Sequence, residues 1–169
     1  MWFLLTPYMT TTMRLITLAL LTASTLVLTD CRKSSEPTPA KPSERERLLT
    51  TPGWNLKNYS KTVTSPSGVV TTTDILSTFD PCFFDDIHHF NADGSLTVDE
   101  KLIKCDVAYP IGLTWEFTSN ETELVIGPGQ PGVAPTQILT LTATTLTYAD
   151  TSIDPNGTKV TLTRTYSAK

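Results

Sequence analysis

The sequence of 169 residues has few charged side chains, only two histidines and no long apolar run. Charged residues make up 18% and the net charge is −4, which excludes a protein that binds nucleic acid through net positive charge. The longest apolar run, residues 15–28, excludes a membrane protein with several spans. No Ser/His/Asp spacing, glycine-rich phosphate loop or carboxylate pair stands out from the rest of the sequence, so we expect no catalytic residue and no cofactor.

The two histidines lie next to aspartates but do not predict a metal site. His88 and His89 point to opposite faces of a strand, so they cannot share an ion without other ligands. Asp86 and His88 share a face, and a buried polar contact explains that pair as well. Residues 89–100 partly fit a calcium loop, but His89 takes its first position, where a carboxylate belongs. A hairpin turn explains the same residues, and we expect no bound metal.

Residues 15–28 follow Arg14 and form the one apolar run of the N-terminal region. As a helix they span about 21 Å, which is short of a bilayer core of about 30 Å. A basic residue before a short apolar run is typical of a secretory signal. We therefore expect a signal peptide over residues 1–30, with Met13 a better start than Met1. A single membrane helix over residues 1–28 is the alternative, which an internal proline and arginine disfavour.

Residues 28–31, Leu-Thr-Asp-Cys, resemble a bacterial lipobox, whose cysteine becomes the lipid-modified first residue. Asp30 departs from this pattern, because Gly, Ala or Ser normally precedes the cysteine. Three cysteines leave one unpaired in an exported protein, and lipidation of Cys31 accounts for it. The alternative is a spare cysteine in an ordinary secreted protein. We expect a lipid anchor in the outer membrane of a cell envelope, on its periplasmic or its surface face.

Residues 31–47 begin with this cysteine and contain three prolines and no large apolar side chain. Such a segment cannot bury a core and stays extended and solvated. We expect a flexible tether between the membrane and one compact domain over residues 48–169. An ordinary solvated linker is the alternative.

The domain is rich in threonine, of which the whole chain has 32. Threonine favours strands, and apolar and polar residues alternate in several short segments, which is typical of antiparallel sheets. The strands that we expect are residues 54–63, 69–73, 86–91, 95–101, 113–118, 123–126, 137–142, 145–149 and 158–167. Short connections favour an all-β, up-and-down closed barrel of eight or nine strands. A two-sheet sandwich is the alternative.

Residues 88–98 predict a hairpin with one of two turns. A two-residue Asp93-Gly94 loop pairs Phe90 with Thr97, whereas a three-residue loop with Gly94 in the left-handed conformation pairs Phe90 with Leu96. The second register places apolar residues opposite one another, so we prefer it. Extended outward, it brings Cys82 to within one residue of Cys105. These two cysteines are therefore expected to form a disulfide.

Short motifs in residues 48–167 together resemble the lipocalin-like lipoproteins of Bacteroidota-type bacteria. The matching residues are Leu48-Leu49, Gly53-Trp54, Cys82, Phe90, Asp93-Gly94, Cys105-Asp106, Thr114-Trp115 and residues 141–146. Lipocalins usually have Gly-x-Trp, whereas Gly53 and Trp54 are adjacent. The resemblance implies a calyx-shaped barrel and a small apolar ligand. It also implies that an arginine of the last strand, Arg164, stacks on Trp54 to close the barrel.

Alternation in the expected strands selects the side chains that face the interior. The candidates for lining a ligand site are Trp54, His88, Phe90, Trp115, Phe117, Leu139, Leu141 and Tyr148. We expect a membrane-tethered protein that holds a small hydrophobic or amphipathic molecule in its barrel, with His88 as a polar contact. The alternative is a packed barrel that serves as a structural or protein-interaction module without a small-molecule site. The sequence leaves the ligand and the oligomeric state open.

Overall fold

The computed structural model describes residues 41–106 and 109–169, which contain one short helix and an antiparallel sheet of nine strands. In chain order the elements are α1 (Glu44–Thr50), β1 (Trp54–Thr64), β2 (Val70–Asp74), the 3₁₀ turns η1 (Leu76–Thr78) and η2 (Pro81–Phe83), β3 (Ile87–Phe90), β4 (Leu96–Asp99), β5 (Trp115–Thr118), β6 (Glu123–Ile126), β7 (Thr136–Leu141), β8 (Thr145–Ile153) and β9 (Lys159–Ala168). The expected signal peptide, Cys31 and most of the tether lie outside the described residues.

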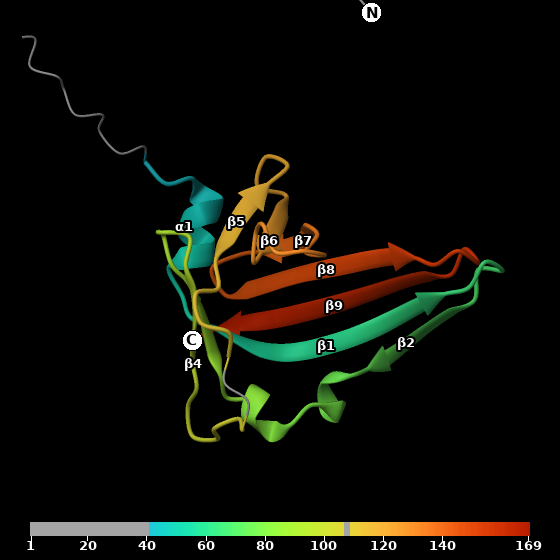
Figure 1. The fold of residues 1–169 in the computed structure, drawn as a ribbon, viewed down its shortest axis with the longest axis horizontal. Coiled ribbons are helices and arrows are strands. Elements are labelled where there is room, and N and C mark those ends of the chain that lie inside the picture. The colour runs from blue at the N-terminus through green and yellow to red at the C-terminus, as the bar shows by residue number, and fades with distance from the viewer. Residues whose placement is uncertain (1–40, 107–108) are drawn as a thin grey trace, which may run out of the picture. The chain divides into compact units, whose positions relative to one another are not determined.

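The first strand and the last strand form the centre of the sheet. Its order is β4-β3-β1-β9-β8-β7-β6-β5, with β2 paired to the outer half of β1. The ladder of β1 and β9 runs from Trp54 opposite Ala168 to Thr64 opposite Lys159. The strands β8, β9, β1 and β2 lie side by side as long ribbons that extend away from α1 (Figure 1). All nine expected segments contain a strand, and they form one sheet rather than a two-sheet sandwich.

The sheet is not closed into the expected barrel, because its outer strands β4 and β5 do not form a ladder. They meet at one isolated bridge between Ser95 and Thr114. Beside it, the amide of Leu96 donates to the carbonyl of Leu113 over 2.8 Å. The next residue back, Gly112, has a φ of 77°, a left-handed conformation that turns the chain away from β4. Backbone hydrogen bonding between the two outer strands is therefore limited to the surroundings of this one bridge.

The hairpin of β3 and β4 has the register that the turn chemistry predicts. Phe90 lies opposite Leu96 and His88 lies opposite Val98. Gly94 has a φ of 81°, the left-handed conformation that the three-residue loop requires. The sequence prediction of this register is confirmed.

Helix α1 covers one end of the sheet and buries Leu49 completely. The indole of Trp54 donates to the carbonyl of Leu49 over 2.8 Å, which ties the helix to the start of β1. The hydroxyl of Ser43 accepts the amide hydrogen of Glu46 and caps the helix N-terminus. The prediction of a tether up to residue 47 is therefore wrong for residues 44–47, which are helical.

A bulge in β7 changes which side chains face the core. Ile138 pairs with Tyr148, and the register shifts before Thr140 pairs with Thr147, so Leu139 is the extra residue. Leu139 is 53% exposed, whereas Ile138 and Leu141 are buried. The expectation that Leu139 faces the interior is wrong, because a bulge interrupts the alternation on which it depended.

We predict that Leu49→Ala lowers the free energy of unfolding by about 2–5 kcal/mol, because it leaves a cavity under a fully buried side chain. Leu139→Ala is the matched control, and it should change this free energy by no more than about 0.5 kcal/mol. Urea denaturation of the two variants measures both values. Equal losses would contradict the buried position of α1 and the outward position of Leu139.

Candidate functional site

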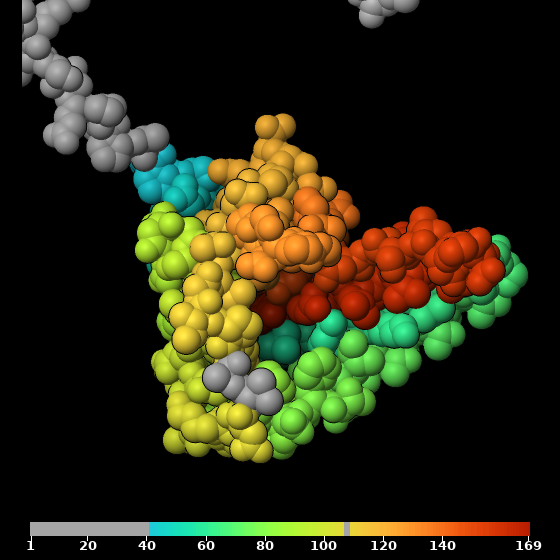
Figure 2. Space-filling view, viewed as in Figure 1, coloured from blue at the N-terminus to red at the C-terminus, as the bar shows by residue number. Residues whose placement is uncertain are grey.

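A pocket of about 210 Å³ opens between the middle of the sheet and the irregular segments beside it. Its lining residues are mostly aromatic: Leu56, Tyr59, Phe79, Phe83, His88, Tyr109, Arg164 and Tyr166. Figure 2 shows this face hollowed between the loop that follows β4, the segment after β2 and the ribbon of β8 and β9. We call this cavity the aromatic pocket.

The floor of the aromatic pocket comes from β1 and β9. A register shift between Leu56 and Asn58 places Leu56 opposite Tyr166 and Tyr59 opposite Arg164. Cross-strand partners share a face, so these four side chains point to the same side of the sheet. Strict alternation along β1 would have put Leu56 and Tyr59 on opposite faces, which is why the sequence did not single out Tyr59.

The outer wall comes from segments that have left the sheet. After β2 the chain forms η1 and η2 instead of continuing along β1, and β3 then rejoins β1 where His88 lies opposite Trp54. Phe79 and Phe83 come from this excursion, and Tyr109 comes from the loop between β4 and β5. No periodicity marks these segments, so sequence reasoning missed all three rings.

Aromatic rings contact one another around the pocket in an unbroken series. The ring centroids are 5.4 Å apart for Tyr59 and Phe79, and 5.8 Å apart for Phe79 and Phe83. The series continues through Tyr109, His88 and Tyr166 to Tyr148, with centroid distances of 6.0, 6.1, 5.5 and 5.7 Å. Such pairs are favourable in tilted and edge-to-face arrangements, so the rings hold one another in place.

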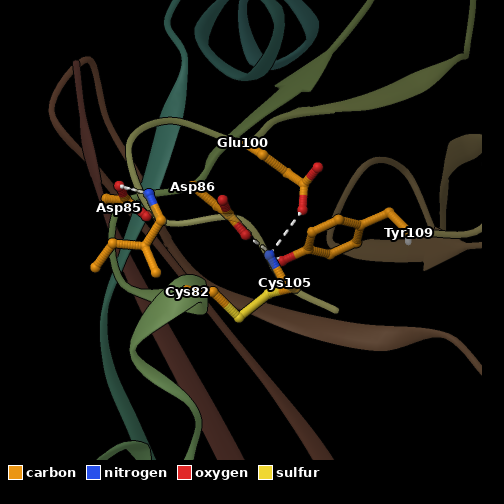
Figure 3. Close-up of a disulfide and its surroundings, with 7 residues drawn as sticks. Cys82, Asp85, Asp86, Glu100, Cys105 and Tyr109 are labelled. Atoms are coloured by element: carbon orange, nitrogen blue, oxygen red, sulfur yellow. Dashed lines mark hydrogen bonds between the residues drawn. A yellow bond between two sulfur atoms is a disulfide. The ribbon is translucent and has the colours of Figure 1, made fainter. Parts of the chain in front are cut away.

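A disulfide joins the two parts of the outer wall. Cys82 of η2 and Cys105 are bonded, with their Cα atoms 5.3 Å apart (Figure 3). This is the pair that the hairpin register predicted. The two cysteines are 23 residues apart in the sequence, and closing this loop contributes roughly 3 kcal/mol to stability in the chain-entropy model.

Two neighbouring carboxylates, of which Asp86 is buried, support the same wall through hydrogen bonds. The carboxylate of Asp85 accepts from the amides of Leu102 and Ile103 over 2.7 and 3.1 Å. The phenol of Tyr109 donates to Asp86 over 2.5 Å (Figure 3). Burial raises the pKa of Asp86, although the hydrogen bond from Tyr109 acts in the opposite direction. These contacts hold the loop that carries Tyr109 against the start of β3.

Arg164 does not close a barrel against Trp54, and the expectation of that stack is wrong. The antiparallel register places Ala168 opposite Trp54, and four residues of strand separate Arg164 from that point by about 13 Å. The guanidinium carbon of Arg164 instead lies 4.4 Å from the ring centroid of Tyr59. Its Nη1 donates to Asp150 over 2.6 Å and its Nη2 donates to the Tyr59 hydroxyl over 2.8 Å.

His88 is the polar group that the sequence placed in the site, and it lines the aromatic pocket. Burial lowers its pKa to about 4, and the neighbouring His89 acts in the same direction. The imidazole is therefore neutral at pH 7, with one ring nitrogen able to donate a hydrogen bond and the other able to accept one.

The other expected ligand residues lie elsewhere. Five belong to the hydrophobic core beneath α1: Trp54, Phe90, Trp115, Leu141 and Tyr148. Phe117 packs against this core, and Leu139 is exposed. The expected interior is thus divided, with a packed core at one end and the aromatic pocket beside it.

Two other hollows are larger, but their linings mix several kinds of side chain and contain few rings. One of about 290 Å³ surrounds the disulfide, and one of about 380 Å³ lies between the ribbon of β8 and β9 and the loop near Gly132. The lining of the hollow at the disulfide combines charged and apolar residues, and that of the hollow near Gly132 consists of small, polar and aliphatic residues. The aromatic pocket has six rings and one cation, whereas the hollow at the disulfide has one ring, Phe83, beside charges of both signs, so we take the aromatic pocket as the candidate site.

No protein-family model and no curated protein matches this sequence. Residues 41–106 and 109–169 contain no helix that is both long and apolar enough to cross a membrane. The same residues contain no group of three or more His, Cys, Asp or Glu side chains placed to hold a metal ion. The function is therefore inferred from the chemistry of the aromatic pocket itself.

We predict that His88 makes the protein less stable as the pH falls. The folded state keeps His88 neutral down to about pH 4, whereas the unfolded chain takes up the proton near pH 6.5. Stability from this group is complete above pH 6.5 and declines between pH 6.5 and 4, by roughly 3 kcal/mol in total. The measurement is urea denaturation of the wild type and His88→Gln between pH 7 and pH 4.

The difference between the two curves isolates the His88 contribution, because other titrating groups are common to both proteins. Leu139→Ala, which removes no titrating group and changes an exposed side chain, is the control, and its curve should stay parallel to that of the wild type. Parallel curves for the wild type and His88→Gln would contradict a neutral buried imidazole.

Proposed function

We propose that this protein is a membrane-tethered, lipocalin-like binding protein that holds a small, largely apolar molecule in the aromatic pocket. The observation that carries this proposal is the pocket itself, with six aromatic or imidazole rings around a single cation. Pockets lined mainly by apolar and aromatic side chains, with a few polar groups, are typical of small-molecule sites.

The lipocalin-like architecture is part of the proposal. It is supported by the pairing of the first strand with the last and by the up-and-down order of β5 to β9. The helix over one end and the single bridge between the outer strands agree with a barrel wall that is interrupted on one side. The loop between the two outer strands supplies Tyr109 to the lining of the aromatic pocket.

The volume of the pocket limits the size of the ligand. About 210 Å³ is below the ~300 Å³ at which sites for drug-sized molecules begin. It exceeds the ~150 Å³ of an apolar protein cavity that holds benzene. The proposed ligand is therefore about the size of one substituted ring, or is a longer molecule of which one end enters the pocket.

We predict that filling the pocket abolishes ligand binding. Leu56 lines it and is only partly buried, so Leu56→Phe places a ring in the cavity. Native mass spectrometry of the full chain, purified from its own host, should detect an added small-molecule mass in the wild type and none in Leu56→Phe. Leu139→Phe, on the exposed face of β7, is the control and should retain the mass.

A folded wild type that carries no added mass, and that binds no apolar probe in titration, would contradict this function. The protein would then be assigned to the other class that the fold allows, a structural or protein-interaction module.

The proposal places the protein at a membrane through a lipid on Cys31. Its support is the lipobox-like sequence and the bonding of Cys82 to Cys105, which leaves Cys31 as the remaining cysteine. The disulfide requires an oxidising compartment such as the periplasm or the cell surface, which agrees with an anchor in the cell envelope.

We predict that Cys31→Ala moves the protein from the membrane fraction to the soluble fraction, because no acyl chain can be attached. Ser34→Ala, a nearby polar change, is the control and should stay with the membrane. Cell fractionation followed by immunodetection measures the distribution. Unchanged membrane association of Cys31→Ala would rule out the anchor.

A further inference from the structure

We propose that the ligand of the aromatic pocket is a small apolar acid, and that Arg164 receives its carboxylate while the surrounding rings receive its body. This inference rests on the proposed function and names the chemical class of the molecule.

Arg164 supplies the charge that selects an acid. Among the described residues that line the pocket it is the one with a full charge, since the imidazole of His88 is neutral. A cation inside a pocket of rings attracts an anion strongly, because the nearby apolar surface weakens the screening by water. The same charge disfavours a cationic ligand.

The guanidinium is held in one orientation and retains donors that are free for a ligand. Its Nη1 and Nη2 each donate one hydrogen bond, to Asp150 and to the hydroxyl of Tyr59. It lies over the ring of Tyr59 and 5.8 Å from the ring centroid of Tyr148. Arginine has five N–H donors, so three have no hydrogen-bond partner among the described residues. A carboxylate can accept two parallel bonds from such a fork.

Asp150 offsets the charge of Arg164 only in part. It lines the neighbouring hollow rather than the aromatic pocket. Its side chain is 36% exposed, whereas that of Arg164 is 26% exposed. Water therefore screens Asp150 more than it screens the pocket side of Arg164. A ligand carboxylate then competes with Asp150 for the same cation, which gives the proposal a specific test.

The remaining lining fits an unsaturated or aromatic body. Phe79, Phe83 and Tyr166 line the pocket with ring surfaces, on which a further ring can pack. Neutral His88 adds a donor and an acceptor without adding charge. An acid with one ring and a short chain satisfies both the rings and the cation within the available volume.

The experiment compares 3-phenylpropionate with 3-phenylpropanamide, which has the same body but no charge. Calorimetric titration of the full chain should give at least about tenfold tighter binding of the acid. Arg164→Met should remove this preference, so that the acid and the amide bind with equal affinity. Lys159→Met is the control, because it removes an exposed cation of β9 that does not line the pocket.

Two further variants sharpen the test. Asp150→Asn removes the competing carboxylate, so it should raise the affinity for the acid several-fold and leave the affinity for the amide unchanged. Arg164→Lys keeps the charge but loses the fork, so it should weaken binding of the acid. It also provides the measurement if Arg164→Met does not fold.

Equal affinities for acid and amide, or an acid affinity that Arg164→Met and Arg164→Lys leave unchanged, would overturn this inference. The proposed function would stand in that case, because the amide occupies the pocket and Leu56→Phe blocks it. Failure of both compounds to bind overturns the inference as well. An added mass in the native spectrum would then preserve the proposed function, and its absence would end both.

Discussion

The ladder between β1 and β9 joins the two ends of the described chain, and the rest of the structure depends on it. It runs the full length of both strands, and it supports β8 on one side and β2 and β3 on the other. The same register sets Tyr59 opposite Arg164 and so builds the floor of the aromatic pocket. A shift of one residue would turn every one of these side chains to the other face.

The interior has two regions that are stabilised by different interactions. Under α1, apolar side chains fill the space, and Leu49 and Trp54 are completely buried. Around the aromatic pocket, buried polar groups form hydrogen bonds with specific side chains, as the hydroxyl of Tyr109 does with the carboxylate of Asp86. Burial of those groups is tolerated because they are hydrogen-bonded, although one oxygen of Asp86 has no partner among the described residues. The first region stabilises the fold, and the second leaves room for a ligand.

Sequence reasoning succeeded where local chemistry decides the structure. Gly94 requires a left-handed turn, and this fixed the hairpin register and the cysteine pair. It failed where tertiary contacts decide, as at the bulges beside Lys57 and at Leu139, which no alternation rule predicts. Helix α1 had a readable signal, the capping pair of Ser43 and Glu46, but the proline-rich sequence before it favoured a tether. The rings of the outer wall lie in irregular segments without any period.

A disulfide joins the two parts of the outer wall to each other, and a few hydrogen bonds rather than a strand ladder attach the wall to the sheet. Local opening costs the least free energy where few ladder bonds must break. The amides of residues 76–84 and 101–106 should therefore exchange with solvent long before those of β1, β8 and β9. Local opening of this wall would therefore change the shape of the aromatic pocket while the sheet stays intact.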